Sequence, residues 1–438
     1  MGLAVGAGIG LLCLSLGFLG SRWPAANLAL ISALMFALFP GLSRSVLILI
    51  ALVGPTLNPP ILGIGAGRLY IVQALIVGVI VGSMVLALRN GMFDRALVLV
   101  FLVALLVLLE TLGRPNAGIA WVYRPLQMFL VAFAVRSLFK GRGTTGLLLA
   151  LAWGSATGCA LATLHAVVPG VDPFVFSRPK DLPFVSTIGS YVRATGAFTY
   201  PNNLGTFAAY TVLFGASAWL LGRPILPRRL SVALMFSGLS ALMVTGSRAA
   251  GLGLICAIFY ITSKASPKRR TLILAGEALI GLLLLVVILN SPTAIEVVEQ
   301  RATSAAGESL FGRLEAFKEP IIGFFNSPII GTGSTESNLD NFVILYVSQT
   351  GILGAALFVG IARTALCSRT PKHYPELWKA LLIALCASGM LQDSLGQTLS
   401  TWFIGALLGL SLLDSERVSR ATNGGIPSVE SQRLATTR

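Results

Sequence analysis

Charged residues are scarce in this chain of 438 residues. Only 11% of the residues are Asp, Glu, Lys or Arg, whereas 55% are hydrophobic, and the mean hydropathy is +0.83. A soluble globular domain carries roughly a quarter charged residues, and a disordered chain carries few large apolar ones. The composition therefore excludes a soluble multidomain protein, and it favours a chain that lies in lipid over most of its length.

Histidine and cysteine are also rare. The 2 histidines, His165 and His373, lie far apart, and the 5 cysteines are scattered without any C-x-x-C pair. Neither a disulfide framework nor a tetrahedral metal site has the spacing that it needs. Most of the cysteines lie in apolar runs, where the thiol behaves as a small hydrophobic group. We therefore expect no metal and no cofactor.

Long apolar runs are what the chain has in abundance. A membrane-spanning helix needs roughly 20 mainly apolar residues, and runs such as 71–88 and 271–289 meet or approach that length. We expect one all-α domain over residues 1–413, a polytopic transmembrane bundle of roughly 12–14 helices. Residues 414–438 are polar and are expected to form a disordered cytoplasmic tail. The first 20 residues lack a basic region and a small-residue cleavage site, so we expect a retained helix there.

Basic residues lie mainly in the short loops between the apolar runs. Lys and Arg outnumber Asp and Glu by 32 to 17, which gives a net charge of +15. Basic clusters in short loops mark the cytoplasmic side of a membrane protein, next to anionic lipid, so the lipid bilayer is the expected partner and nucleic acid is not. The clusters are Arg136/Lys140/Arg142, Arg223/Arg228/Arg229, Lys264/Lys268/Arg269/Arg270 and Arg363/Arg369/Lys372.

Two long polar interruptions, 169–202 and 291–338, break the apolar pattern. With the basic loops inside, alternation of the runs places both interruptions on the outer side, as extracytoplasmic loops. The same alternation places a tight turn at Gly246-Ser247-Arg248 on that side. The apolar runs that bear on this assignment are 119–139, 145–168, 203–221, 231–245, 249–262, 377–391 and 399–413. In a bacterium the outer side is the periplasm or the cell surface.

Three arginines, Arg193, Arg248 and Arg313, fall on the expected outer side. A guanidinium group is permanently charged, and its forked donors suit phosphate oxygens. Each arginine alone is equally compatible with anchoring a helix end or pairing with a nearby glutamate. All three on one side favour an anionic ligand such as the phosphate or diphosphate of a lipid.

Asp340 and Asn341 stand at the beginning of an apolar run. A carboxylate at that position can accept a proton from a sugar hydroxyl. It can equally cap the helix that follows, because Asp and Asn favour the N-cap and an anion favours the positive end of the helix dipole. The sequence leaves both roles open, and they are compatible with each other.

The ordered set of these motifs resembles the bacterial O-antigen ligase and Wzy-type polysaccharide polymerase superfamily. The resemblance covers roughly residues 190–360, and the hydropathy profile agrees over most of the chain. The motifs that carry it are Arg193-x-x-Gly196-x-Phe198-x-x-Pro201-Asn202, Thr245-Gly-Ser247-Arg248, Arg313 in an amphipathic segment, Pro328-x-x-Gly331-x-Gly333, Asp340-Asn341 and Gly351.

The resemblance implies a GT-C-like glycosyltransferase in the bacterial cytoplasmic membrane, with its site facing the periplasm. Such an enzyme works without metal. The hydroxyl of a glycan acceptor attacks a polyprenyl-diphosphate-linked glycan donor, and the lipid diphosphate leaves with inversion. By motif position, Arg193 and Arg313 would grip the diphosphate. The same resemblance assigns Arg248, Asn202, Asn341 and Glu336 to substrate binding.

One residue departs from the ligase pattern. Ligases of this superfamily have His immediately before the position of Asn341, and this chain has Asp340 there. The departure favours the polymerase, or exopolysaccharide, branch over a ligase that transfers glycan to a lipid or protein acceptor. It also leaves two candidates for the general base, Asp340 and Glu336.

A secondary transporter or lipid flippase is the alternative from another class. Such a protein needs paired charges near the middle of the membrane and broken helices in related halves. The charges of this chain gather on the expected outer side instead, which favours the enzyme.

Overall fold

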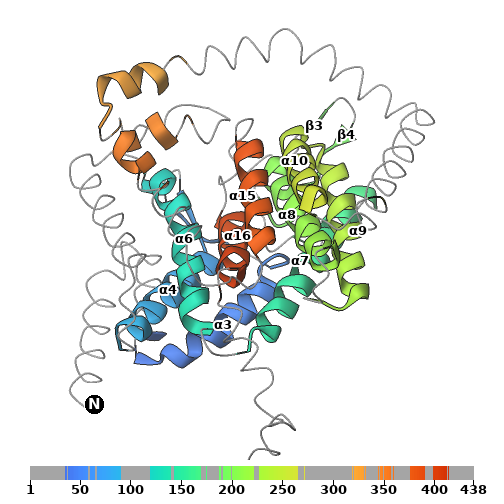
Figure 1. Ribbon diagram of the computed structural model, residues 1–438, viewed down its shortest axis with the longest axis horizontal. Coiled ribbons are helices and arrows are strands. Elements are labelled where there is room, and N and C mark those ends of the chain that lie inside the picture. Colours follow the sequence, from blue (N-terminus) through green and yellow to red (C-terminus); the bar gives the residue numbers. More distant parts are fainter. Residues whose placement is uncertain are drawn as a thin grey trace, which may run out of the picture.

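The computed structural model describes residues 35–57, 60–89, 119–139, 143–168, 187–220, 226–264, 318–331, 344–359, 375–389 and 398–413, without a few single or paired positions inside these ranges, and residues 174 and 271. The described part is predominantly helical (Figure 1). Its labelled helices are α3 (Pro40–Val53), α4 (Ile71–Arg89), α6 (Ile119–Phe139), α7 (Thr145–Val167), α8 (Pro201–Leu220), α9 (Arg228–Thr245), α10 (Arg248–Lys264), α15 (Pro375–Gly389) and α16 (Thr398–Ser411), and residues 320–326 and 350–356 are also helical.

The helical class expected from the apolar runs is confirmed for the described part, and the boundaries differ by only a few residues. Two antiparallel hairpins are additions that the apolar pattern did not predict. One joins β1 (Pro60–Ile64) to β2 (Gly67–Tyr70), and the other joins β3 (Thr187–Ile188) to β4 (Tyr191–Val192) inside the first long polar interruption. The apolar run 271–289, apart from its first residue, and the tail 414–438 lie outside the described residues.

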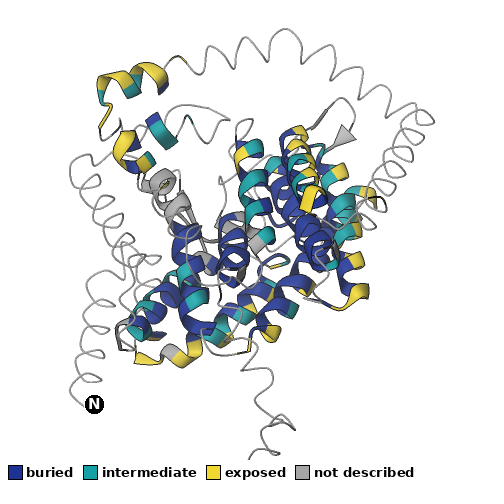
Figure 2. Cartoon of the chain, in the orientation of Figure 1, coloured by how far each residue is buried: buried dark blue, intermediate teal, exposed yellow. Residues whose placement is uncertain are grey.

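The central helix is α8. Every residue from Asn203 to Ala218 is buried, and α8 contacts α7, α9, α10, α15 and α16. A helix that is apolar on all sides is stable only when it is surrounded in this way. Its buried hydroxyls bond within the helix: Thr211 Oγ1 donates to the carbonyl of Phe207 at 2.9 Å, and Ser217 Oγ donates to the carbonyl of Leu213 at 2.7 Å. Figure 2 shows buried residues along α8 and along the other helices of the bundle.

Glycines that pack against a neighbouring helix fix the relative directions of the helices. Gly215 of α8 lies against Ser231 near the start of α9, whereas Gly238 of α9 lies against Ala208 near the start of α8, so the two helices are antiparallel. Helices α10 and α15 are also antiparallel, since Gly253 lies against Ala384 and Tyr260 contacts Glu376. Helices α6 and α16 are parallel, since Gly405 lies against Met128 and Gly409 against Ala132. Helices α3 and α7 are parallel, since Gly154 lies against Ala51 and Gly158 against Pro55.

These directions gather basic side chains at one end of the bundle, which we call the basic end. There the Arg44 guanidinium of α3 donates to the carbonyl of Gly143 at 2.9 Å and lies 5.0 Å from the centre of the Phe139 ring of α6. The described basic residues of this end are Arg44, Arg136, Arg228, Arg229, Lys264 and Lys379. The opposite end, the Arg193 end, holds the start of α8, the end of α9 and the start of α10.

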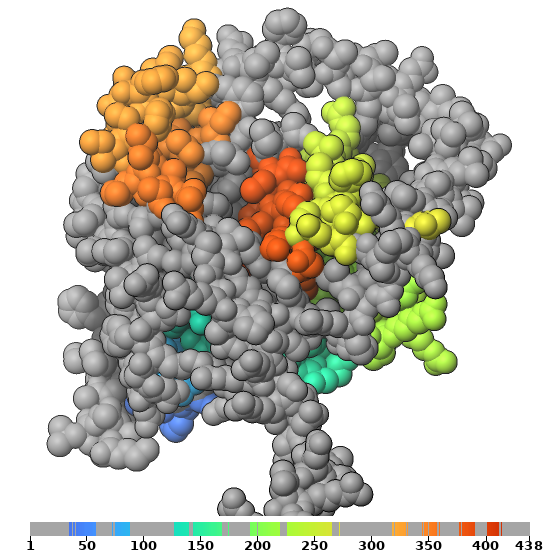
Figure 3. All heavy atoms as spheres, in the orientation of Figure 1, coloured from blue at the N-terminus to red at the C-terminus, as the bar shows by residue number. Residues whose placement is uncertain are grey.

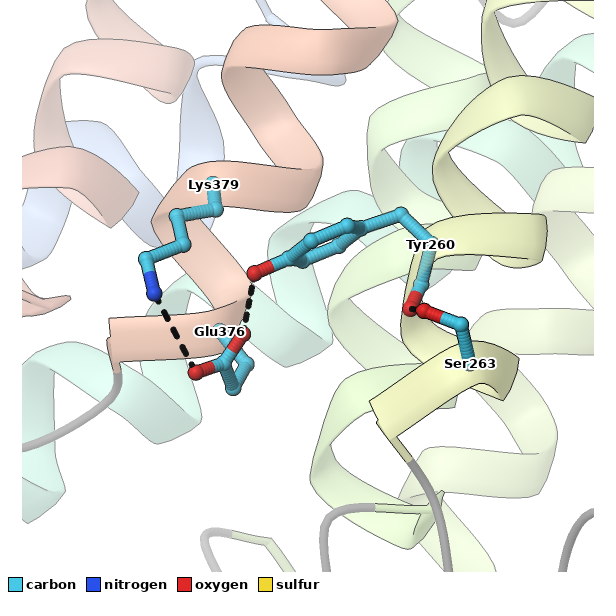
Figure 4. A network of polar contacts seen from close by, with 4 residues as sticks. All are labelled: Tyr260, Ser263, Glu376 and Lys379. Carbon is cyan, nitrogen blue, oxygen red and sulfur yellow. Dashed lines mark hydrogen bonds and ion pairs between the residues drawn. The ribbon is translucent and has the colours of Figure 1, made fainter.

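A polar network joins α10 to α15 at the basic end (Figure 4). The Tyr260 hydroxyl donates to Glu376, and Lys379 pairs with the same carboxylate at 3.4 Å. Lys264 lies 6.0 Å from the centre of the Tyr260 ring. The network fixes the register of two helices that are far apart in sequence but lie side by side (Figure 3).

Large apolar side chains are exposed on the outside of the bundle. On α10, Leu252, Ile255 and Phe259 follow one another at helical spacing, and Phe259 is 72% exposed. On α9, Phe236 is 75% exposed, and Trp153 of α7 is 55% exposed. In a soluble monomer most hydroxyl side chains are exposed and most large aromatic rings are buried. Here several hydroxyls are buried inside the bundle, and aromatic rings are exposed on its outside.

Among the described residues, one helix is long and apolar enough to cross a membrane by itself. It is Thr145–Val167, with 23 residues and a mean hydropathy of 1.7. A single helix of this kind is also found in the cores of soluble proteins, so length and composition establish the helical class and leave the membrane bundle as a hypothesis.

Candidate functional site

The candidate site begins with the turn between α9 and α10. Gly246 ends α9 with a φ of 58°, a left-handed conformation that glycine adopts without steric cost. Ser247 then caps α10, since its Oγ accepts from the backbone N–H of Ala250 at 3.4 Å. Two residues are thus enough to reverse the chain, and the turn predicted at Gly246-Ser247-Arg248 is confirmed.

Arg193 follows β4 and reaches this turn. Its Nε donates to the carbonyl of Thr245 at 2.6 Å, and its Nη2 donates to Oδ1 of Asn202 at 2.8 Å. The backbone N–H of Ala194 donates to the carbonyl of Val244 at 3.2 Å, which ties the strand to the same helix end. The Thr245 carbonyl belongs to the last turn of α9, where the helix dipole is negative and favours a cation.

The other members of the Arg193 motif shape the loop that returns to α8. Gly196 has a φ of 58° and stands where an added Cβ would lie 3.1 Å from the Cβ of Ala162. Phe198 packs on Phe207, with 5.0 Å between ring centroids. Pro201 is the first residue of α8, a position that its missing N–H suits. These residues are structural, and they bring Asn202 back to within hydrogen-bonding distance of Arg193.

A close approach of α8 holds the turn against Arg193. An added Cβ on Gly205 would lie 2.5 Å from the Cβ of Ser247 and 3.0 Å from Oγ1 of Thr245. Only the absence of a side chain allows this contact. The start of α8, the end of α9 and the Arg193 loop therefore form one packed unit.

Arg248 is exposed at the first position of α10. Among the described residues, its guanidinium has no hydrogen-bond or ion-pair partner. The N-terminus of a helix carries the positive end of the dipole, so a second positive charge there is unfavourable unless an anion is bound nearby. Arg248 also stands at the head of the apolar stripe formed by Leu252, Ile255 and Phe259.

Four of the candidate residues, Arg313, Glu336, Asp340 and Asn341, lie outside the described residues. The neighbouring motif residues are described in part. Pro328 accepts at its carbonyl from the N–H of Ile352 at 2.8 Å, and Gly331 donates to Ser327 at 2.8 Å. Gly351, with a φ of 64°, passes so close that an added Cβ would lie 2.4 Å from the carbonyl oxygen of Ile329. The Pro328 motif and Gly351 thus form one contact.

The structure adds two partners of Arg193 that sequence reasoning did not identify. One is the side-chain oxygen of Asn202, whose assignment to substrate binding stays a prediction. The other is the Thr245 carbonyl, which could not be found because a main-chain acceptor has no sequence signature. Within the described ranges, no three His, Cys, Asp or Glu side chains gather as they would around a metal ion.

Comparison of the chain with family models, with curated proteins and with solved structures finds no match. The residues and their geometry are therefore the basis for any functional conclusion.

Proposed function

We propose that the protein is an integral-membrane glycosyltransferase that polymerises polyprenyl-diphosphate-linked oligosaccharides during the synthesis of a bacterial surface polysaccharide. The observation that carries the proposal is the joining of two separate motifs. Arg193 and Asn202 come from one motif, and Thr245 and Arg248 from another, and Arg193 bonds to both segments at a single end of the helices.

The proposed reaction requires a permanent positive charge beside the diphosphate leaving group. An acceptor hydroxyl attacks the anomeric carbon of the donor, the bond from that carbon to the diphosphate oxygen breaks, and the configuration inverts. The diphosphate departs with the bonding electron pair, so negative charge grows on its oxygens. Arg193, with Arg313, stabilises that charge through charge-assisted hydrogen bonds. The hydroxyl proton goes to a carboxylate, for which Asp340 and Glu336 are the candidates.

Charge distribution supports a membrane orientation. Apart from Arg248, the described basic residues of α9, α10 and α15 lie at the basic end, which the positive-inside rule assigns to the cytoplasm. The Arg193 end then faces the periplasm, and the helix directions are those that alternating crossings require. Exposed apolar side chains on α9 and α10 suit contact with acyl chains. We extend these features to a polytopic, GT-C-like bundle of roughly 12–14 helices with two long extracytoplasmic loops.

The proposed sidedness predicts opposite labelling of two exposed arginines. In a cysteine-free background, Arg248→Cys is expected to react with a membrane-impermeant maleimide in intact spheroplasts. Arg229→Cys, at the other end of α9, is expected to react only after the membrane is opened, because the cytoplasmic face is shielded. Labelling of both positions from the same side would contradict the proposed orientation.

Glycan analysis of a deletion strain tests the reaction itself. Loss of the gene is expected to remove the polymer and to leave single repeat units on lipid carriers or at the surface, because the donor is still made but is not joined. If the protein were a ligase, its loss would instead leave complete polymer attached to the lipid carrier. If the protein were a lipid flippase, its loss would leave the lipid-linked substrate in the cytoplasmic leaflet. Normal polymer in the deletion strain would overturn the proposal.

A further inference from the structure

We propose that the basic end holds a binding site for an anionic phospholipid of the cytoplasmic leaflet, formed by Arg44 and the exposed apolar face of α3. The site depends on the proposed membrane orientation. It lies at the opposite end of the bundle from Arg193, and it takes no part in the proposed reaction. The charged headgroup and the acyl chains of the lipid each meet a different feature of α3.

Arg44 is a cation whose partners in the described part of the chain are all neutral. Its Nη2 donates to the main-chain carbonyl of Gly143 at 2.9 Å, and its guanidinium lies 5.0 Å from the centre of the Phe139 ring. Among the described residues, its buried Nε has no hydrogen-bond partner and Arg44 forms no ion pair. The carboxylate of Glu376, at the same end, is bound by Lys379 instead. Because a guanidinium is permanently charged, an anionic ligand is favoured beside Arg44.

The start of α7 adds to the positive potential beside Arg44. Gly143, which Arg44 contacts, lies just before α7, and the two helices α3 and α7 lie side by side (Figure 1). The first turn of α7 contains no acidic residue, and Thr144 makes no side-chain bond at the N-cap. The first N–H groups of a helix have no partner within the helix, and the dipole is positive there. Arg44 and the helix start therefore favour the same ligand chemistry, that of a phosphate.

The exposed face of α3 favours a lipid over a free anion. Leu42, Leu49 and Leu52 lie on this face and are 44%, 55% and 45% exposed. Leu49 and Leu52 follow Arg44 at distances of roughly 8 and 12 Å along the helix axis, at 1.5 Å per residue. Because α3 is parallel to α7, it runs away from the basic end and, in the proposed orientation, into the membrane. The headgroup and an acyl chain of one phospholipid can thus contact Arg44 and these leucines together.

Titration of the purified full chain in detergent micelles tests the site. Phosphatidylglycerol and phosphatidylcholine with the same acyl chains are added, bound lipid is counted by native mass spectrometry, and the melting temperature is measured. Phosphatidylglycerol is expected to bind more tightly and to raise the melting temperature. Arg44→Gln is expected to weaken its binding about fivefold, the effect of one basic side chain near an anionic lipid. Arg229→Gln, which removes an exposed arginine of α9 at the same end, is expected to leave the binding unchanged.

Ser45 allows the charge of the site to be changed without disturbing the packing, because it is exposed on the same helix beside Arg44. Ser45→Glu is expected to keep or raise the melting temperature, since the carboxylate can pair with Arg44. It is also expected to weaken phosphatidylglycerol binding about fivefold, because it neutralises the same charge. Ser45→Gln has a side chain of the same size without the charge, and it is expected to bind the lipid as the unchanged protein does.

Four results would overturn the site. They are equal affinity for the two lipids, equal losses in Arg44→Gln and Arg229→Gln, full binding by Ser45→Glu, and displacement of phosphatidylglycerol by inorganic phosphate but not by sodium chloride of the same ionic strength. The last result would identify a free phosphate as the ligand. Polymer formation by Arg193→Ala is measured separately, so failure of the lipid site leaves the proposed reaction standing, and failure of the reaction leaves the lipid site standing.

Discussion

Arg193→Ala is expected to abolish polymer formation. The guanidinium is assigned to the charge that grows on the leaving diphosphate, and removing one such donor lowers rates by roughly 10²–10³-fold in other enzymes. Arg193→Lys is expected to recover only a small part, because an ammonium keeps the charge but cannot bond to Asn202 and Thr245 in the observed fork. Chain-length analysis of the product made in membranes from a lipid-linked repeat unit measures the effect.

Two controls separate a chemical role of Arg193 from a structural one. Arg229→Ala removes an exposed arginine of the basic end and is expected to leave the product unchanged. Membrane abundance and melting temperature of the Arg193 variants show whether the bundle survives, because the side chain also ties a loop to α9. Full activity of Arg193→Ala at normal abundance would remove Arg193 from the reaction.

Gly205→Ala is expected to damage the fold at the Arg193 end. Its Cβ would lie 2.5 Å from the Cβ of Ser247, which is attached directly to the main chain and cannot rotate away. The turn after α9 must therefore shift, and with it the Thr245 carbonyl that holds Arg193. Overpacking of this kind costs about 1–3 kcal/mol. We expect a clear fall in melting temperature together with a large loss of polymer.

Gly251→Ala is the matched control for Gly205→Ala. It places the same methyl group on α10, where nothing lies within 4 Å of the added Cβ. In a helix, alanine is favoured over glycine by about 0.5–1 kcal/mol, so a small gain in stability is expected. Equal melting temperatures for the two variants would mean that α8 and the turn do not pack as closely as described.

Much of the helical framework follows from the sequence. The runs 119–139 and 145–168 correspond to α6 and α7 almost residue for residue, since apolar length alone defines such helices. The turn at Gly246 was also predictable, because glycine and serine end one helix and begin the next. The hairpin β3–β4 was not, since strands of two residues each leave no periodicity to detect.

For the candidate site, the sequence predicted which residues take part but not how they contact one another. Arg193, Asn202 and Arg248 were found through motifs, but the bond from Arg193 to Thr245 joins residues 52 positions apart, and its acceptor is a main-chain atom. The same holds for Tyr260 and Glu376, which are 116 positions apart. Such contacts depend on how helices pack, and packing is decided by small residues such as Gly205 and Gly253 whose neighbours the sequence does not identify.

The burial of α8 has a consequence for biosynthesis. Its first neighbours, α7 and α9, are translated just before and just after it, but part of its surface is covered by α16, where Phe403 lies 4.8 Å from Phe207 between ring centroids. A nascent chain thus carries an unfinished interior until its last helices leave the ribosome. Truncation ahead of α16 should yield a product that quality-control proteases remove, even though every motif of the Arg193 end has already been synthesised.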